Sequence, residues 1–570
     1  MNTRCAGMPA DHDRLCFDSG VSCAGRRQIE SIGGSAPLTQ VLDSRSVRTA
    51  LWLSVFVTAF NVMTVVTLLP IIVRDLGTTI GTGQTALVLL ALVTAIASSA
   101  EEYLSEIYGR RRVYRSGLVL FAVGLLITFS GATSLALLFG LSVIAGLGAA
   151  VLVTAPFVAV ADATQLTEAA RRSRTGRLML ALTAGALAGP VSAGVIATAV
   201  GWRWAFVPQL LIVAVIAWLA SSLPVAPRRG RQPVDWVGTV LVLVALGCVV
   251  VGVGLGGEYG WWRPKEPFLI SGVTIPPFDL SIAPVLIAAG IVVAVVATAW
   301  GYRKTKTGGQ PSAWRLRPLG DAKLILFALA VLLLAAVDIG IAFILYTYLP
   351  IAADVGTIET VILLLPKSGV ALLVGGWLVY RGTSRLPGWL VSSGFAALAV
   401  AASLLAFTAD QSPSVVVLIS ALVVAGVGVS LAGRGLFTTA AATTTADRPA
   451  GSLFVSGTDL GSALGVAVFG AILISVATLN VVGAVADVDL LSTSDAELEQ
   501  IADELEDGIL HMSEAEAIAL AADIDAVEPI ERAIRSSVAD AMRVGFLAVT
   551  AVSIIGVAVS LLLWRRQVPG

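Results

Sequence analysis

Long apolar runs separated by short polar segments make up most of the chain from residue 49 to residue 564. A helix of about 20 residues, rising about 1.5 Å per residue, crosses a hydrocarbon core about 30 Å thick. The pattern therefore predicts an all-α polytopic membrane protein with about 14 transmembrane helices. The predicted spans are 49–73, 83–106, 114–131, 134–159, 177–199, 203–223, 236–256, 281–301, 323–349, 356–380, 387–408, 413–433, 452–478 and 542–564.

Arginine and lysine are concentrated in every second connection between these spans. The basic connections begin near Arg110, Arg171, Arg228, Arg303, Arg381 and Arg434. Lys and Arg in short loops stay on the cytoplasmic side of a membrane. The alternation therefore predicts that both termini are cytoplasmic and that residues 1–48 form a polar cytoplasmic tail. We expect the protein to lie in a bacterial cytoplasmic membrane.

A polar insert of residues 481–541 precedes the last span and is predicted to face the outside. Two capping boxes, beginning at Ser494 and Ser513, indicate helices, and a third helix is predicted from Pro529. Two interpretations of this insert stay open: a solvated amphipathic segment packed on the membrane domain, or a docking element for an envelope partner.

The composition agrees with a membrane protein and excludes several function classes. Hydrophobic residues make up 56% and charged residues 13% of the chain, against about 25% charged residues in soluble domains. The net charge of -1 gives no basic excess for nucleic acid. The only histidines, His12 and His511, lie in polar segments, and neither a GxxxxGK[ST] loop nor a CxxC pair occurs. We therefore expect no catalytic residues, no metal and no cofactor, and a protein that is not an enzyme.

A charged motif follows the second span. Glu102, Glu106, Gly109, Arg110 and Arg111 belong to the segment EYLSEIYGRR. This segment resembles the GxLxDRxGRR signature of the major facilitator superfamily. Carboxylates beside guanidinium groups at a helix end can pair and separate again when two halves of a transporter rock, so the motif is predicted to be a gate latch. Positive-inside anchoring is the alternative.

Two further motifs narrow the resemblance. Gly185, Gly189, Pro190 and Gly194 belong to a segment that resembles the GxxxGPxxGG signature of antiporters in this superfamily. The WRWAF segment at 202–206 is similar to the start of helix six in its fourteen-helix drug:proton antiporter branch. The glycines are predicted either to allow a kinked helix along the substrate pathway or to serve ordinary close helix packing.

The resemblance implies the major facilitator fold, with two six-helix bundles and two intercalated helices. The expected division is a tail at 1–48, a bundle at 49–223, a linker with helices seven and eight at 224–302, helices nine to thirteen at 303–480, the insert at 481–541, and the last helix with a short tail at 542–570.

The chain departs from the branch at two positions in its first half. Asn61 stands where the branch usually has an acid in helix one, and Ser142 stands where helix four usually has an arginine. Both members of a charge pair are thus replaced by neutral groups that can hydrogen-bond. Because an unpaired buried charge is costly, the double replacement is a consistent state.

Ionisable residues in other spans become the candidates for proton coupling. Asp338 lies about 12 residues before Pro350, and Lys367 lies about 11 residues after Gly356. At about 1.5 Å per residue both are some 16 to 18 Å from the outer face, so they are predicted to meet near mid-bilayer. A structural ion pair and a proton-exchange site are both open.

Asp459 is the third candidate for a buried charge. It lies in the half of span thirteen that is nearer the cytoplasm. A structural ion pair with Arg434 is the alternative to a role in coupling.

The leading hypothesis is a secondary active transporter, a proton-coupled exporter of amphipathic or lipophilic compounds that works by alternating access. Its expected partners are a small amphipathic or lipidic substrate, protons and membrane lipids. Two alternatives remain: an exporter or flippase of a lipid or cell-envelope precursor, and a non-transporting membrane scaffold or sensor.

Overall fold

The structure, a computed structural model, describes residues 44–78, 80–131, 133, 136–161, 167–220, 236–257, 259–264, 269–270, 273–274, 280–306, 322–353, 355–381, 388–409, 414–443, 450–486 and 527–565. Its elements in chain order are α3 (Arg45–Leu76), α4 (Ile80–Tyr108), α5 (Arg110–Ser130), η1 (Leu137–Ala145), α7 (Gly146–Ala161), α8 (Glu168–Val200), η2 (Trp202–Phe206), α9 (Val207–Leu219), α10 (Trp236–Leu255), β1 (Leu269–Ile270), β2 (Val273–Thr274), α11 (Ile282–Lys306), α12 (Ala322–Ala353), α13 (Thr357–Tyr380), α14 (Trp389–Thr408), α15 (Val415–Thr443), α16 (Ala450–Ala486) and α19 (Val527–Arg565).

The helices confirm a multi-pass integral membrane protein. Within the described ranges, 13 helical stretches are long and apolar enough to cross a membrane. The shorter apolar stretch Val240–Leu255, in α10, accounts for the remaining predicted span. Large apolar side chains stay exposed on the outer surfaces of the bundle, as lipid contact requires.

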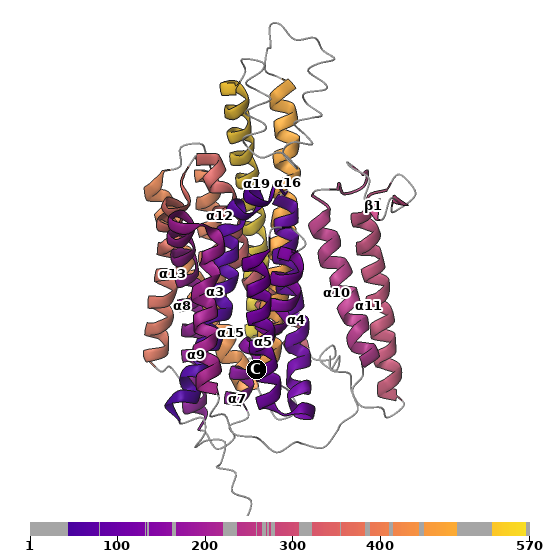
Figure 1. The fold of residues 1–570 in the computed structure, drawn as a ribbon, viewed down its shortest axis with the longest axis vertical. Coiled ribbons are helices and arrows are strands. Elements are labelled where there is room, and N and C mark those ends of the chain that lie inside the picture. The colour runs from indigo at the N-terminus through magenta and orange to yellow at the C-terminus, as the bar shows by residue number, and fades with distance from the viewer. Residues whose placement is uncertain are drawn as a thin grey trace, which may run out of the picture.

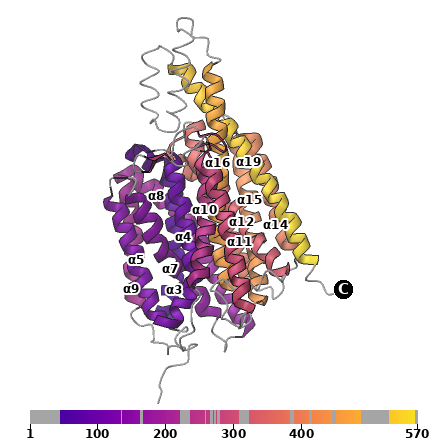
Figure 2. The same ribbon diagram turned by 90° about the vertical axis from the view of Figure 1, so that its right-hand side faces the viewer.

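The described helices form two groups that follow the order of the chain. In the first half α3 packs along α8 and α9, and α4 and α5 pack on η1 and α7. In the second half α12 packs on α16 and α19, and α14 packs on α15 and α19. Figures 1 and 2 show these long helices standing side by side as one bundle. We call the end that carries the α4–α5 connection the basic-loop end, and the end where α16 stops and α19 starts the insert end.

Two helix pairs form the seams between the halves. Along the first seam α8 packs on α13. A Cβ built at Gly194 would lie 3.6 Å from the Cβ of Val361 near the insert end. Along the second seam α4 packs on α16, where Nε2 of Gln84 donates to the carbonyl oxygens of Val466 (3.1 Å) and Ala467 (3.2 Å). Both seams are therefore closed at the described contacts.

A separate helical hairpin covers the α4–α16 seam. Helix α10 contacts both α4 and α16, whereas α11 packs mainly on α10, and both lie at the side of the bundle in Figure 1. A Cβ built at Gly257 would lie 2.9 Å from Cα of Ala471. The indole N–H of Trp261 donates to Oγ of Ser475 at 3.3 Å. The helices that interrupt the two halves in the sequence thus lie outside the bundles in space, and they hold closely to α16.

The polar insert differs from its predicted extent. Helix α16 continues to Ala486, and α19 starts at Val527, so the helix predicted from Pro529 is continuous with the last span. In Figure 2 these two helices project together beyond the other helices at the insert end. The predicted capping boxes at Ser494 and Ser513 lie outside the described residues.

Candidate functional site

Asp338 and Lys367 form an ion pair between α12 and α13. Nζ of Lys367 lies 2.7 Å from Oδ1 of Asp338 and donates to the main-chain oxygen of Asp338 at 2.8 Å. The side chain of Lys367 is only 12% exposed, whereas that of Asp338 is 40% exposed. The predicted meeting of these residues is confirmed, and the carboxylate is the more open of the two partners.

The surroundings of Lys367 fix the position of its ammonium group. Pro366 lies inside α13 directly before it and cannot donate a backbone hydrogen bond. Gly426 of α15 packs against the main-chain oxygen of Lys367, where a Cβ would collide. The backbone of Lys367 is thus held by α15, and its ammonium contacts both the carboxylate and the main-chain oxygen of Asp338.

Asp459 and Arg434 do not form the ion pair suggested by the sequence. No salt bridge joins them within the described ranges, and Oδ2 of Asp459 is buried without a hydrogen-bond partner there. Nε and Nη1 of Arg434 are likewise buried without a partner among the described residues. That prediction is wrong because Arg434 directs its guanidinium toward α8.

The neutral pair of the first half is also separated. Ser142, in the π-helical segment η1, donates its hydroxyl to the main-chain oxygen of Ala86 at 2.7 Å. Asn61 is 1% exposed, and neither its amide nitrogen nor its oxygen has a partner among the described residues. Both side chains are buried inside the half, but they do not bond to each other.

The glycine motif of α8 serves two different contacts. A Cβ at Gly185 would collide with the main-chain oxygen of Phe56, and one at Gly189 would lie 2.6 Å from that of Phe60. These positions, with Pro190 inside the helix, set the close packing of α8 on α3. Gly194 instead faces α13 across the seam. The structure thus favours close packing for Gly185 and Gly189, and only Gly194 contacts the other half.

The charged motif lies at the turn between α4 and α5. Gly109 has φ of +88°, a conformation that residues with a Cβ rarely adopt, and Arg110 and Arg111 start α5 directly after it. The side chains of Glu102 and Glu106 lie outside the described residues. Gly109 therefore explains the sharp turn, and the latch remains a prediction.

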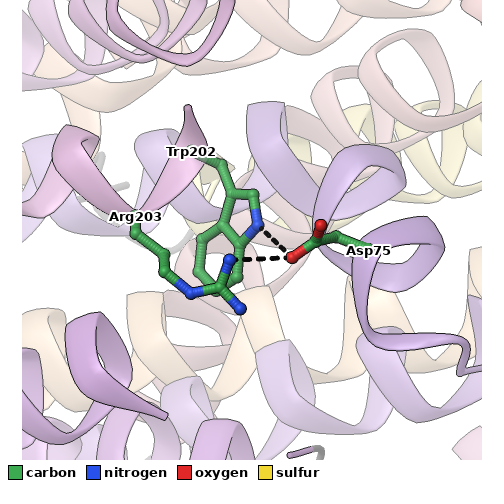
Figure 3. Close-up of polar contacts among 3 residues, drawn as sticks. All are labelled: Asp75, Trp202 and Arg203. Carbon is green, nitrogen blue, oxygen red and sulfur yellow. Dashed lines mark hydrogen bonds and ion pairs between the residues drawn. The ribbon is translucent and has the colours of Figure 1, made fainter. Parts of the chain in front are cut away.

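Sequence reasoning missed an acid at the insert end of α3. Oδ2 of Asp75 accepts the indole N–H of Trp202 at 2.9 Å and a guanidinium N–H of Arg203 at 2.8 Å, as Figure 3 shows. The guanidinium of Arg203 also lies over the Trp202 ring, 4.4 Å from its centroid. The cluster ties the end of α3 to the start of η2. The sequence did contain a signal for this contact: an acid follows the first predicted span, and the WRWAF segment with its tryptophan and arginine begins the sixth.

Comparison with protein families gives a match over most of the chain. The model described as Major Facilitator Superfamily matches residues 51–469. An uncharacterised MFS-type transporter of Mycobacterium tuberculosis is 26% identical over 249 residues, which cover 43% of this chain and 35% of the relative. The cephamycin export protein CmcT of Amycolatopsis lactamdurans is 28% identical over 251 residues, 43% of this chain and 51% of the relative.

A third relative, multidrug resistance protein 3 of Bacillus subtilis, is 25% identical over 219 residues, 37% of this chain and 41% of the relative. The chain thus matches between about a third and a half of the length of these curated relatives.

Solved structures show the same fold at low sequence identity. A peptide transporter POT solved in complex with sulfate has a TM-score of 0.54 and 15% identity, over 86% of this chain and 99% of the other. The xylose transporter XylE from E. coli, in a partially occluded inward-open conformation, has a TM-score of 0.50 and 11% identity, over 75% and 91% of the two chains.

Proposed function

Because the chain belongs to the major facilitator superfamily, we propose that it is a proton-coupled exporter of amphipathic or lipophilic compounds that works by alternating access. Relatives named for export, efflux or multidrug resistance support the direction of transport. The two halves provide the moving bodies, and the α8–α13 and α4–α16 seams are the places where they separate.

The Asp338–Lys367 ion pair carries the proposal of proton coupling. Charged side chains in the middle of transmembrane helices are costly, so they usually mark a functional site. The side chain of Asp338 is 40% exposed and can therefore exchange a proton. When Asp338 is ionised, Lys367 holds the carboxylate. When Asp338 takes a proton, Lys367 keeps its bond to the main-chain oxygen and the link between the side chains is lost. The position of α12 against α13 then differs between the two protonation states.

The first half offers no equivalent charge at the two positions where the antiporter branch carries its pair. Asn61 and Ser142 are neutral, and Ser142 is engaged with a main-chain oxygen of α4. In this proposal Asp338 and Lys367 replace that pair, which moves the coupling to the second half of the protein.

Transport by Asp338→Asn protein in proteoliposomes with an imposed pH gradient tests the proposal. The variant cannot exchange a proton at this position, so we expect it to bind a lipophilic dye but to lose accumulation driven by the gradient. Asp540→Asn, at an exposed acid of α19 that pairs loosely with Arg543, is the matched control and should accumulate the dye normally. Accumulation at the wild-type rate in Asp338→Asn would exclude this carboxylate as the coupling site.

We also propose that both termini and the basic-loop end face the cytoplasm and that the insert end faces outward across a bacterial cytoplasmic membrane. The alternation of Lys and Arg supports this orientation. A cysteine at Ser494, in a background without the four native cysteines, should react with an impermeant maleimide in intact cells. Labelling that requires permeabilised cells would reverse the orientation.

A further inference from the structure

Two nitrogen atoms of one guanidinium group lie buried and without a partner among the described residues at the seam between the halves. Nε and Nη1 of Arg434 are inaccessible to solvent and have no hydrogen-bond partner in the described part of the chain. Arginine stays protonated in proteins, so the group keeps its charge, and an unpaired charge is costly inside a bilayer. A native protein retains such a group when another molecule supplies the missing partner.

The surroundings of Arg434 place this charge between α15, α13 and α8. A Cβ built at Gly176 of α8 would lie 2.7 Å from Nη1 and 3.3 Å from Nη2 of Arg434, and 3.1 Å from Cγ2 of Val379 of α13. Any side chain at position 176 would push the guanidinium away. Because Gly176 has no side chain, the guanidinium of Arg434 from the second half can lie against α8 of the first half.

Asp459, the acid at the same height as Arg434, does not neutralise the charge of Arg434. A Cβ at Gly433, beside Arg434, would lie 3.8 Å from Leu334 of α12, and a Cβ at Gly461, two residues from Asp459, would lie 2.9 Å from the neighbouring Ala335. Arg434 and Asp459 therefore stand at one height along α12. They nevertheless form no ion pair within the described ranges.

Asp338, the other intramembrane acid of the site, already has a partner in Lys367. Asp338 pairs with Lys367 at 2.7 Å, so neither charge of that pair is available to Arg434. At this seam the described residues thus hold a charged guanidinium whose Nε and Nη1 donors have no protein acceptor.

We propose that Arg434 binds the anionic group, a carboxylate or a phosphate, of the transported amphipathic molecule. The planar fork of a guanidinium matches both groups through two parallel hydrogen bonds. The inference rests on the proposed export function and makes its substrate class specific: amphipathic acids, whose head group pairs with Arg434 while the apolar part lies among the surrounding apolar side chains. Because Arg434 contacts α8 across the seam, binding of an anion there also changes the contact between the halves.

Binding of dansyl-labelled undecanoate and of its methyl ester to the full chain in phosphatidylcholine nanodiscs tests the proposal. The two probes differ only in the charge of the head group. Arg434→Gln should weaken binding of the acid by roughly tenfold or more and leave binding of the ester unchanged. Arg434→Lys keeps the charge without the fork and should give an intermediate loss. Arg543→Gln, at an exposed arginine of α19, is the control and should bind both probes like the wild type.

Unchanged binding of the ester shows that each variant is folded. An equal loss for acid and ester in Arg434→Gln, or unchanged affinity for the acid, would overturn the proposal. If adding Asp459→Asn to the Arg434→Gln variant restored binding and transport, the proposal would also be overturned. Arg434 would then serve as the counter-charge of Asp459. Dodecyl phosphate and anionic phosphatidylglycerol as competitors distinguish a free amphipathic acid from a lipid head group.

The same measurements separate this inference from the proposed function. Acid binding that depends on Arg434, without accumulation of either probe under a pH gradient, would contradict export and leave the anion site intact. Accumulation of the ester with no role for Arg434 would contradict only the anion site.

Discussion

Three acidic side chains in the described helices differ in the partners that their carboxylates have. Asp338 has a lysine partner at mid-helix, Asp75 has an indole and a guanidinium at a helix end, and Asp459 has a buried oxygen without a partner. The free energy at stake differs accordingly. An ion pair exposed to solvent contributes little, whereas a buried donor or acceptor that loses its partner costs about 1 to 3 kcal/mol.

We expect Asp75→Ala to destabilise the protein by about 1 to 2 kcal/mol, because the N–H of the buried Trp202 loses its acceptor. Arg203→Ala should cost less than about 1 kcal/mol, because that ion pair is partly exposed to solvent. Thermal unfolding in detergent measures both. A larger effect of Arg203→Ala than of Asp75→Ala would contradict this ranking of the two contacts.

For single residues, the sequence predicted the position along the membrane helix but not the side of the helix from which the side chain projects. Counting residues from the helix ends correctly brought Asp338 and Lys367 together. The position of Asp459 in the half of its span nearer the cytoplasm left an ion pair with Arg434 open, but position along a helix contains no information about the side from which a side chain leaves, and the pair is absent among the described residues. Asp75 was missed because its partners lie in a segment more than a hundred residues away.

At the scale of elements, small residues decide which helices approach closely. Lipid is as apolar as a leucine side chain, so packing between membrane helices depends on shape and not on removal of apolar surface from water. The contact of α8 with α3 shows this at Gly185, where the backbone of Phe56 lies directly against the glycine.

We expect Gly185→Ala to destabilise the protein by about 1 to 3 kcal/mol, because the added methyl group would meet rigid backbone atoms of α3. Gly369→Ala in α13 is the matched control, since a Cβ there meets nothing within 4 Å. It should be neutral or slightly stabilising. Thermal unfolding of the two variants measures the difference, and equal midpoints would show that α8 can move away from α3 at little cost.

The hydrophobic pattern predicted the number of helices and failed at their ends. A helix continues past its apolar run wherever the next residues allow it, and hydropathy does not register that continuation. Helix α8 therefore starts at Glu168 although its predicted span starts at 177, and α16 runs to Ala486 although its span ends at 478. The π-helical segment η1 had no signal in the pattern, because its hydrogen-bond register changes without a change in hydrophobicity.

For the whole molecule, alternating access requires the seams to open at one end at a time. The built Cβ of Gly194 lies 3.6 Å from Cβ of Val361, within the range of a disulfide. We expect the double variant Gly194→Cys/Val361→Cys, in a background without native cysteines, to stop transporting dye after oxidation and to recover after reduction. Dye accumulation in proteoliposomes is the measurement.

A control for this cross-link exists inside the second half. The built Cβ of Gly457 in α16 lies 3.6 Å from Cβ of Val331 in α12. Gly457→Cys/Val331→Cys should therefore cross-link equally well and still transport, since these helices belong to one half. Undiminished transport in the oxidised Gly194/Val361 variant would mean that α8 and α13 stay together at the insert end throughout the cycle.

The hairpin of α10 and α11 crosses the membrane twice, so it returns the chain to the side from which it departed. Helix α9 ends at Leu219 and α12 starts at Ala322, both at the basic-loop end. The insertion therefore has even parity, and the second half keeps the sidedness it would have if α9 were joined directly to α12. A single added crossing would have inverted every helix from α12 onward. Even parity thus permits a module to be gained beside the α4–α16 seam while both bundles keep their orientation.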